Sequence, residues 1–262
     1  MRKIYLTIML LCMLFVSCDE VDINDRLTYV EPPQVSRAVL IEDFTGQYCV
    51  NCPRATEEIE RLVAQYGDTT VIAVAIHSGP FSKQKGTPSP LYTELGDVYF
   101  NYWNLSSQPV GIIDRLPYPL DFTDWAWGVN YELEQKAPIA FVTETGFDEE
   151  SRQASIAVQT IGLDSTLVNG KLQVWLVEDS IDNFQYMPNG ALEEHYNHMH
   201  VFRASVNDIW GDAVKVNHGE VARNDYQIIL DPSWIPEHCA FVTFLYDENG
   251  VRQVAKKRLI NH

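Results

Sequence analysis

The sequence has few basic residues for its size. Its 262 residues include 19 Lys and Arg against 36 Asp and Glu, which gives a formal net charge of −17. Proteins bind nucleic acids through basic surfaces, because their lysines and arginines displace the counterions of the phosphate backbone. The densest basic cluster here is the short run Lys256, Lys257 and Arg258, which is typical of a solvated strand edge. The composition therefore argues against nucleic acid as a partner.

The apolar stretch at the N-terminus is also short. Ile4 to Val16 spans 13 residues, which is too few for a comfortable transmembrane helix. It follows two basic residues and precedes Ser17, as in an export signal with a small residue before the cleavage site. We therefore expect residues 1–17 to be a signal peptide. Its removal takes away two basic residues and no acidic one, so the mature chain is still more acidic.

The residues around the predicted cleavage site favour a lipoprotein. Val16-Ser17-Cys18 resembles the end of the bacterial lipobox, although Phe15 stands where Leu is usual. That resemblance implies that Cys18 carries lipid and anchors the protein to a membrane. An ordinary secretory signal with an incidental cysteine is the alternative.

Residues 18–35 are expected to form an acidic linker that ends in Pro32-Pro33. The acidic run Asp19 to Asp22 resembles the surface-export signal of Bacteroides-type lipoproteins, and a plain solvated tether is equally compatible with it. The expected location is the outer membrane, at either its periplasmic or its cell-surface face.

Cysteine is scarce, and two of the five cysteines form a Cys49-Val50-Asn51-Cys52 motif. A short apolar run, 37–44, precedes the motif, an amphipathic pattern from Arg54 to Tyr66 follows it, and a second apolar run, 71–76, comes next. This order predicts a βαβ unit, a context in which CxxC indicates redox chemistry. Zinc would need two more ligands, and neither a second CxxC nor a nearby His pair exists.

The position of the motif suggests a division of roles between the two cysteines. The unpaired N–H groups and dipole of a helix N-terminus would favour the thiolate of Cys49, which attacks a partner sulfur. Cys52 would then close the intramolecular disulfide and release the product. A purely structural disulfide is a poor alternative, because so small a loop gives little stabilisation. A fold kept as a binding scaffold, with oxidised and idle cysteines, remains a second alternative.

The spacing from Asp43-Phe44 to Cys49 resembles that of the thioredoxin superfamily. The resemblance implies that Asp43 takes a proton from Cys52, with Glu42 as the competing carboxylate. It also implies a cis peptide bond at Gln108-Pro109, where Pro109 would shape the contact with a client, although an ordinary trans proline is the alternative. We expect residues 36–136 to form a thioredoxin-like α/β domain, with further helices at 91–103 and 121–135.

From Pro138 the pattern changes to alternating stretches separated by turns. Asn169-Gly170 and 247–250 are typical of hairpin turns. We therefore predict an all-β immunoglobulin-like sandwich domain over residues 137–262. Its seven expected strands are 139–145, 154–161, 172–178, 198–206, 226–230, 240–246 and 252–259.

His198 and His200 lie two residues apart and would share one face of a strand. Such a pair could bind a metal with His195 or Glu194, but hydrogen bonding is the default for two histidines without further ligands. We therefore predict neither a metal site nor a cofactor. Cys239 has no evident partner and is expected to be a small buried residue.

The order of these features resembles the outer membrane protein 28 family of Bacteroides-type lipoproteins. The C-terminal part of that resemblance rests on His198, His200, Val201, Arg203, Trp210 and Gly211. We expect an exported lipoprotein that exchanges thiols and disulfides with a protein partner, as a possible oxidoreductase. The alternative is a non-catalytic cell-surface binding or adhesion protein that presents a ligand-binding scaffold.

Overall fold

The computed structural model describes residues 35–260, which belong to one compact unit that begins at Val35. The predicted signal peptide, Cys18 and nearly all of the acidic linker lie outside the described residues. The described part is mostly β, and none of its helices is long and apolar enough to cross a membrane. Its α-helices are α2 (Cys52–Tyr66), α3 (Glu94–Tyr102) and α4 (Trp125–Leu133).

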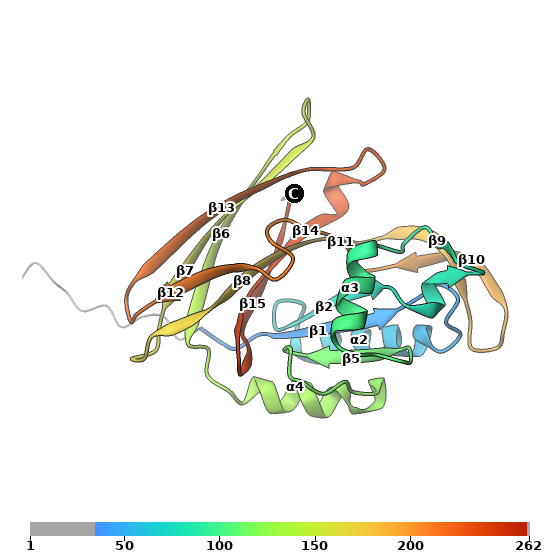
Figure 1. Ribbon diagram of the computed structural model, residues 1–262, viewed down its shortest axis with the longest axis horizontal. Helices are drawn as coiled ribbons and strands as arrows, with labels where there is room; N and C mark the ends of the chain where they lie inside the picture. Colours follow the sequence, from blue (N-terminus) through green and yellow to red (C-terminus); the bar gives the residue numbers. More distant parts are fainter. Residues whose placement is uncertain (1–34, 261–262) are drawn as a thin grey trace, which may run out of the picture. The chain divides into compact units, whose positions relative to one another are not determined.

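The strands form one large sheet and three small ones (Figure 1). The large sheet contains β1 (Val39–Thr45), β2 (Val71–His77), β5 (Val110–Ile113), β8 (Val168–Glu178), β11 (Val201–Ser205), β12 (Asp212–Val216), β14 (Cys239–Asp247) and β15 (Gly250–Arg258). A three-stranded sheet contains β6 (Ile139–Asp148), β7 (Gln153–Gly162) and β13 (Val221–Ile229). Two hairpins are made of β9 (Ile181–Tyr186) with β10 (Leu192–His198), and of β3 (Lys83–Gln84) with β4 (Thr87–Pro88).

The predicted βαβ unit is present. β1 and β2 pair in parallel, with Val39 opposite Val71, and α2 connects them. The helix buries Ala55, Ile59 and Leu62, whose spacing of three and four residues places them on one face of the helix. At its end, Gly67 adopts a φ of 93° and its N–H bonds to the carbonyl of Val63, a conformation that a residue with a side chain rarely adopts.

The expected fold class is wrong, because strands from both halves of the chain share one mixed sheet. Its order is β15-β14-β8-β11-β2-β1-β5, with β12 also on β8. β11 lies parallel to β2, with Val201 opposite Ala75, and the N–H of Ala75 donates to the carbonyl of His200 at 2.8 Å. The chain is therefore not a separate thioredoxin-like α/β domain followed by an immunoglobulin-like sandwich. The expected boundary at 136/137 falls between α4 and β6.

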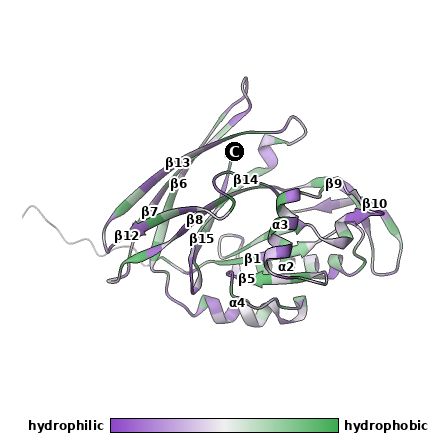
Figure 2. Cartoon of the chain, in the orientation of Figure 1, coloured by the Kyte–Doolittle hydropathy of each residue, from purple (hydrophilic) through white to green (hydrophobic). Residues whose placement is uncertain are grey.

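The hydrophobic cores follow this arrangement. One core lies on the α3 side of the large sheet and joins Leu40, Val74 and Tyr99 to Trp175 and Phe244. A second core lies under α2 and α4, on the other face of β1 and β2. The third lies between β6 and β7 and the strands β8, β12 and β14. Figure 2 shows mixed hydrophilic and hydrophobic segments along β6, β7 and β13, and β13 alternates between exposed and partly buried residues.

Other expectations hold only in part. The helices predicted at 91–103 and 121–135 are present as the shorter α3 and α4, and the turn at 247–250 joins β14 to β15. The hairpin turn predicted at Asn169-Gly170 is wrong, because both residues lie inside β8. A Cβ on Gly170 would lie 2.5 Å from the carbonyl oxygen of Tyr246, so the glycine permits close strand packing. β9, β10 and β12 were not expected as separate strands.

A buried ion pair lies where the two halves of the chain meet. The Arg115 Nε donates to the Glu42 Oε1 at 2.8 Å, and both side chains are almost fully buried. Burial raises the pKa of Glu42, and the charge of Arg115 opposes that rise. The guanidinium lies among aromatic rings of both halves, 5.9 Å from the ring centroid of Tyr99 in the first half and 4.3 Å from that of Tyr246 in the second. Cation–π attraction adds to the ion pair in such a setting.

We predict that Arg115→Leu lowers the free energy of unfolding by about 3–5 kcal/mol, because it leaves the Glu42 carboxylate buried without its partner. Arg61→Ala is the control, since it breaks an exposed pair with Glu58 and should lower the free energy of unfolding far less. Urea denaturation of both variants gives the comparison. Equal effects of the two substitutions would contradict the structural role of the buried pair.

Candidate functional site

Cys49 and Cys52 form a disulfide bond, with 5.4 Å between their Cα atoms. Helix α2 begins at Cys52, so Cys49 lies in the turn that precedes the helix. The sequence had predicted Cys49 at the N-terminus of the helix itself. The N–H of Cys52 donates to the carbonyl of Cys49 at 3.3 Å. Pro53 occupies an early helical position, where the missing N–H costs no helical hydrogen bond. Each cysteine is only 2% exposed.

The two acidic residues of β1 face opposite sides of the sheet. Glu42 faces Arg115, whereas Asp43 lines a pocket together with Cys52. Asp43 is 1% exposed, and its Oδ1 has no hydrogen-bond partner among the described residues. Burial raises the pKa of Asp43 to about 8. Of the two acidic residues, Asp43 is therefore the one that shares a pocket with Cys52.

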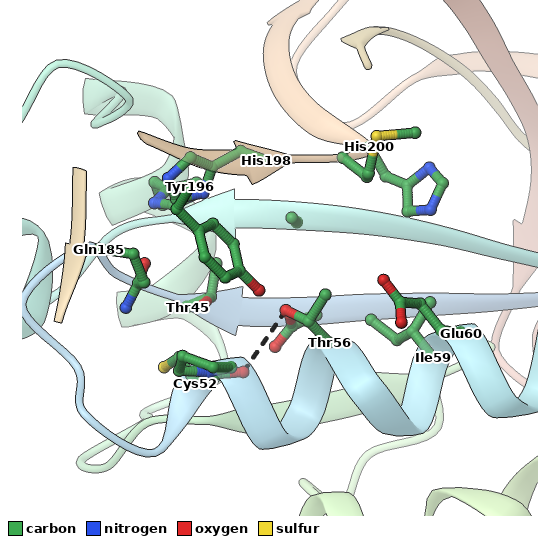
Figure 3. Close-up of a pocket in the computed structure, with 14 residues that line it drawn as sticks. Thr45, Cys52, Thr56, Ile59, Glu60, Gln185, Tyr196, His198 and His200 are labelled. Carbon is green, nitrogen blue, oxygen red and sulfur yellow. Dashed lines mark hydrogen bonds between the residues drawn. The ribbon is translucent and has the colours of Figure 1, made fainter. Parts of the chain in front are cut away.

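The pocket next to Asp43 lies between α2 and the β9–β10 hairpin. Its volume is about 40 Å³, enough for a few water molecules. Figure 3 shows the ring of Tyr196 reaching from β10 toward α2, with its hydroxyl directed at Thr56. Glu60 and His200 also line the pocket, farther along the helix from Cys52. Water in the pocket would give the unpartnered Asp43 carboxyl hydrogen-bonding partners.

The predicted cis peptide bond is present at Gln108-Pro109. Val110 pairs with Phe44, which brings Pro109 to the end of β1 from which the Cys49 turn begins. The Gln108 side chain is buried there, and its Nε2 donates to the carbonyls of Thr45 and Ser78 at 2.6 and 2.9 Å. These bonds hold the Pro109 segment against the end of β1.

The expectation that His198 and His200 share a strand face is wrong. His198 ends β10, and its ring packs edge-on against buried His77, with 5.4 Å between centroids. His200 lies between β10 and β11 at a φ of 57° and contacts Asp179 at 3.0 Å. Burial lowers the pKa of His198 to about 4 and that of His77 well below its usual value. Two neutral rings can pack together at neutral pH without charge repulsion.

A metal-binding site would need a suitable group of side chains among the described residues. Within residues 35–260, no group of three or more His, Cys, Asp or Glu side chains has an arrangement that could hold a metal ion.

Cys239 is free and buried, as expected from the sequence. Burial raises the pKa of its thiol to about 12, so the thiol stays protonated and unreactive at neutral pH.

Gln185 and Tyr196 of the β9–β10 hairpin line the pocket with Cys52 but were not predicted as site residues. Gln185 is 3% exposed and donates to the carbonyl of Cys49 at 3.0 Å, although 136 residues separate the two. The one available signal was the turn at Asn189-Gly190, where Gly190 has a φ of 80°. Asn-Gly between two short strands is a strong hairpin signal.

The fold and the site define a mostly β protein that holds a covered CxxC disulfide at the start of a helix. The family model described as outer membrane protein Omp28 matches residues 96–262, nearly two thirds of the chain. The chain belongs to this family of outer membrane proteins, which confirms the family suggested by the sequence and the outer-membrane location. The match begins after Cys52, so it leaves the role of the disulfide open.

Two solved structures have a similar fold, and a third match covers less of the chain. HBP35 of Porphyromonas gingivalis has a TM-score of 0.64 at 16% identity, with coverage of 86% of this chain and 76% of that one. A structural-genomics protein from Agrobacterium tumefaciens has a TM-score of 0.56 at 13% identity, with coverage of 87% and 97%. A domain of the outer membrane lipoprotein Omp28 from Porphyromonas gingivalis is 24% identical, with coverage of 47% and 88% and a TM-score of 0.35. No curated protein matches the chain.

We predict a specific pH dependence of stability for Asp43→Asn. In the folded protein Asp43 keeps its proton up to about pH 8, whereas its usual pKa is 3.8. The folded state then binds more protons than the unfolded one between these values, so wild-type stability falls as the pH rises through this window. The variant lacks this loss, and its stability relative to wild type should rise from about pH 4 to about pH 8 and then level off.

Urea denaturation across this pH range measures the effect. Asp68→Asn, which removes an exposed carboxylate, is the matched control and should follow the wild-type profile. A constant difference between Asp43→Asn and wild type would contradict the raised pKa.

Proposed function

We propose that this outer membrane protein exchanges thiols and disulfides through Cys49 and Cys52. The observation that carries the proposal is the buried carboxyl of Asp43, which lies beside Cys52 in one pocket and whose Oδ1 has no hydrogen-bond partner among the described residues. A buried carboxyl without a partner destabilises a fold, and functional sites are where such groups are retained. A pKa of about 8 suits a group that takes up and returns a proton near neutral pH.

In the proposed reaction the thiolate of Cys49 attacks a client disulfide. A mixed disulfide forms, and one client sulfur leaves as a thiolate and takes a proton. Asp43 removes the proton of the Cys52 thiol, and the Cys52 sulfur then attacks Cys49 and releases the second client thiol. The client gains two electrons and two protons, and the cysteine pair becomes the disulfide. The same steps in reverse oxidise a client dithiol.

A second candidate is a non-catalytic binding protein with an idle disulfide. The 2% exposure of both cysteines favours it, because a covered sulfur cannot be attacked in line. Part of the aromatic surface is available for a ligand, since Trp127 and Tyr131 stack on α4 and are 57% and 50% exposed. The two candidates differ in whether Cys49 ever forms a bond to another molecule.

Trapping separates the candidates. In Cys52→Ser the resolving thiol is absent, so mixed disulfides through Cys49 should accumulate and be visible as reducible adducts by electrophoresis and peptide mass spectrometry. Cys49→Ser is the matched control and should form markedly fewer adducts, because Cys52 is the resolving cysteine. Absence of Cys49 adducts in oxidised client mixtures would favour the binding candidate.

We also propose that Cys18 carries the lipid that attaches the protein to the outer membrane. Cys18→Ala should then move the chain from the membrane to the soluble fraction and abolish labelling by a radioactive fatty acid, since the acyl chains supply the anchoring energy. Cys239→Ala, which alters a buried thiol, is the control and should keep the label. A labelled Cys18→Ala protein would place the lipid elsewhere. Protease digestion of intact cells then tells the cell-surface face from the periplasmic one.

A further inference from the structure

The β9–β10 hairpin is an insertion in the large sheet. Glu178 at the end of β8 lies opposite Val201 at the start of β11, so the chain leaves and rejoins the sheet at adjacent positions. Between them, β9 and β10 pair only with each other and form a two-stranded sheet of their own. Figure 1 shows this hairpin at the end of the molecule opposite β6, β7 and β13.

Strand β9 bonds directly to the turn that carries Cys49. The Gln185 Nε2 donates to the carbonyls of Cys49 and Gly46 at 3.0 and 3.3 Å. The N–H of Tyr186 donates to the carbonyl of Gln47 at 2.9 Å. Backbone acceptors beside the disulfide are therefore satisfied by the hairpin.

Side chains of the turn bind the hairpin in return. The Gln47 Nε2 donates to the Asn183 Oδ1 at 2.9 Å and to the carbonyl of Phe184 at 2.8 Å. The ring of Tyr48 packs against Phe184 and Tyr186, with centroid distances of 5.3 and 5.9 Å. These contacts hold the hairpin against the turn that carries Cys49, and both cysteines are buried.

We infer that the β9–β10 hairpin is a detachable cover, and that a thiol reaches the Cys49–Cys52 disulfide only when the hairpin has moved away. The inference rests on the proposed function, for which it supplies the access step. A two-stranded hairpin is only marginally stable without packing, and most of β10 is exposed. The contacts above, together with the packing of His198 against His77, hold the hairpin closed. Its removal frees the carbonyl of Gln47 and takes one of the two donors from the carbonyls of Gly46 and Cys49, so an extended polypeptide can use these oxygens as hydrogen-bond acceptors.

The rate of disulfide reduction in the oxidised full-length protein tests the cover. With dithiothreitol the Cys49–Cys52 bond breaks, the protein gains two thiols and the reagent becomes a cyclic disulfide. Gln185→Ala removes the donor to Cys49 and Gly46, and it should speed reduction roughly tenfold. Gln227→Ala, at an exposed position of β13, is the matched control and should react at the wild-type rate. Alkylation followed by peptide mass spectrometry reports which cysteines are free.

The dependence of that rate on urea separates hairpin opening from global unfolding. Local opening exposes little surface, so the rate should hardly change at low urea concentrations, whereas reduction through global unfolding would rise steeply. A steep rise in the wild type, or an unchanged rate in Gln185→Ala, would overturn the inference.

A second variant removes the cover. Because Glu178 and Val201 already face each other, an Asn-Gly turn can replace Ser180 to Met199 and close β8 directly onto β11. This variant should be reduced about a hundredfold faster than wild type or more. A folded variant that is reduced at the wild-type rate would overturn the inference; if the variant fails to fold, Gln185→Ala decides.

The same variant distinguishes failure of the cover from failure of the proposed function. Rapid reduction by dithiothreitol without any mixed disulfide in its Cys52→Ser form would support the cover and contradict thiol–disulfide exchange. Mixed disulfides that form equally fast with and without the hairpin would support exchange and overturn the cover.

Discussion

The pairing of β11 with β2 determines where everything around the disulfide lies. It is a short parallel contact, with Val201 opposite Ala75, yet it joins strands of both halves of the chain into one sheet. Because β9 and β10 are inserted just before β11, the position of β11 beside β2 also brings the hairpin over the start of α2. A separate β domain on a flexible connection would not hold Gln185 within hydrogen-bonding distance of the Cys49 carbonyl. Parallel pairs between distant segments form late and at an entropic cost, and the buried Glu42–Arg115 pair and its aromatic rings lie at this junction.

The same arrangement protects the Cys49–Cys52 disulfide but also limits its reaction with a client. The hairpin lines the pocket that contains Asp43 and Cys52, and burial raises the pKa of Asp43. The disulfide is buried as well, so a client sulfur has no in-line path to it in this closed state. An exported protein meets many thiols and oxidants, so a cover that opens for a suitable client would limit unselective reactions. The small pocket beside Asp43 keeps a space for water while the disulfide is covered.

Local features could be predicted from the sequence, and non-local ones could not. The apolar runs, the amphipathic helix and the CxxC motif depend on residues close in the chain, whereas the cis Gln108-Pro109 bond was predicted from a family resemblance. The single sheet depends on β11 meeting β2, about 125 residues apart, and no periodicity reports such a pairing. β9 contains Asp182, Asn183 and Gln185, three polar residues that weaken the strand signal. The side chains of Asn183 and Gln185 bond to the Cys49 turn, and Asp182 pairs with His195 of β10. Asn169-Gly170 has the sequence of a hairpin turn but lies inside β8, where Gly170 permits close packing of the strands.

The reduction potential of the Cys49–Cys52 couple tests the central claim most directly. Equilibration of the pure protein with glutathione or dithiothreitol buffers, followed by alkylation and mass spectrometry, gives the value. The account predicts a potential within the range of exchange proteins, between about −270 and about −120 mV. A potential well below about −300 mV is typical of structural disulfides, and it would contradict a role for this pair in thiol–disulfide exchange.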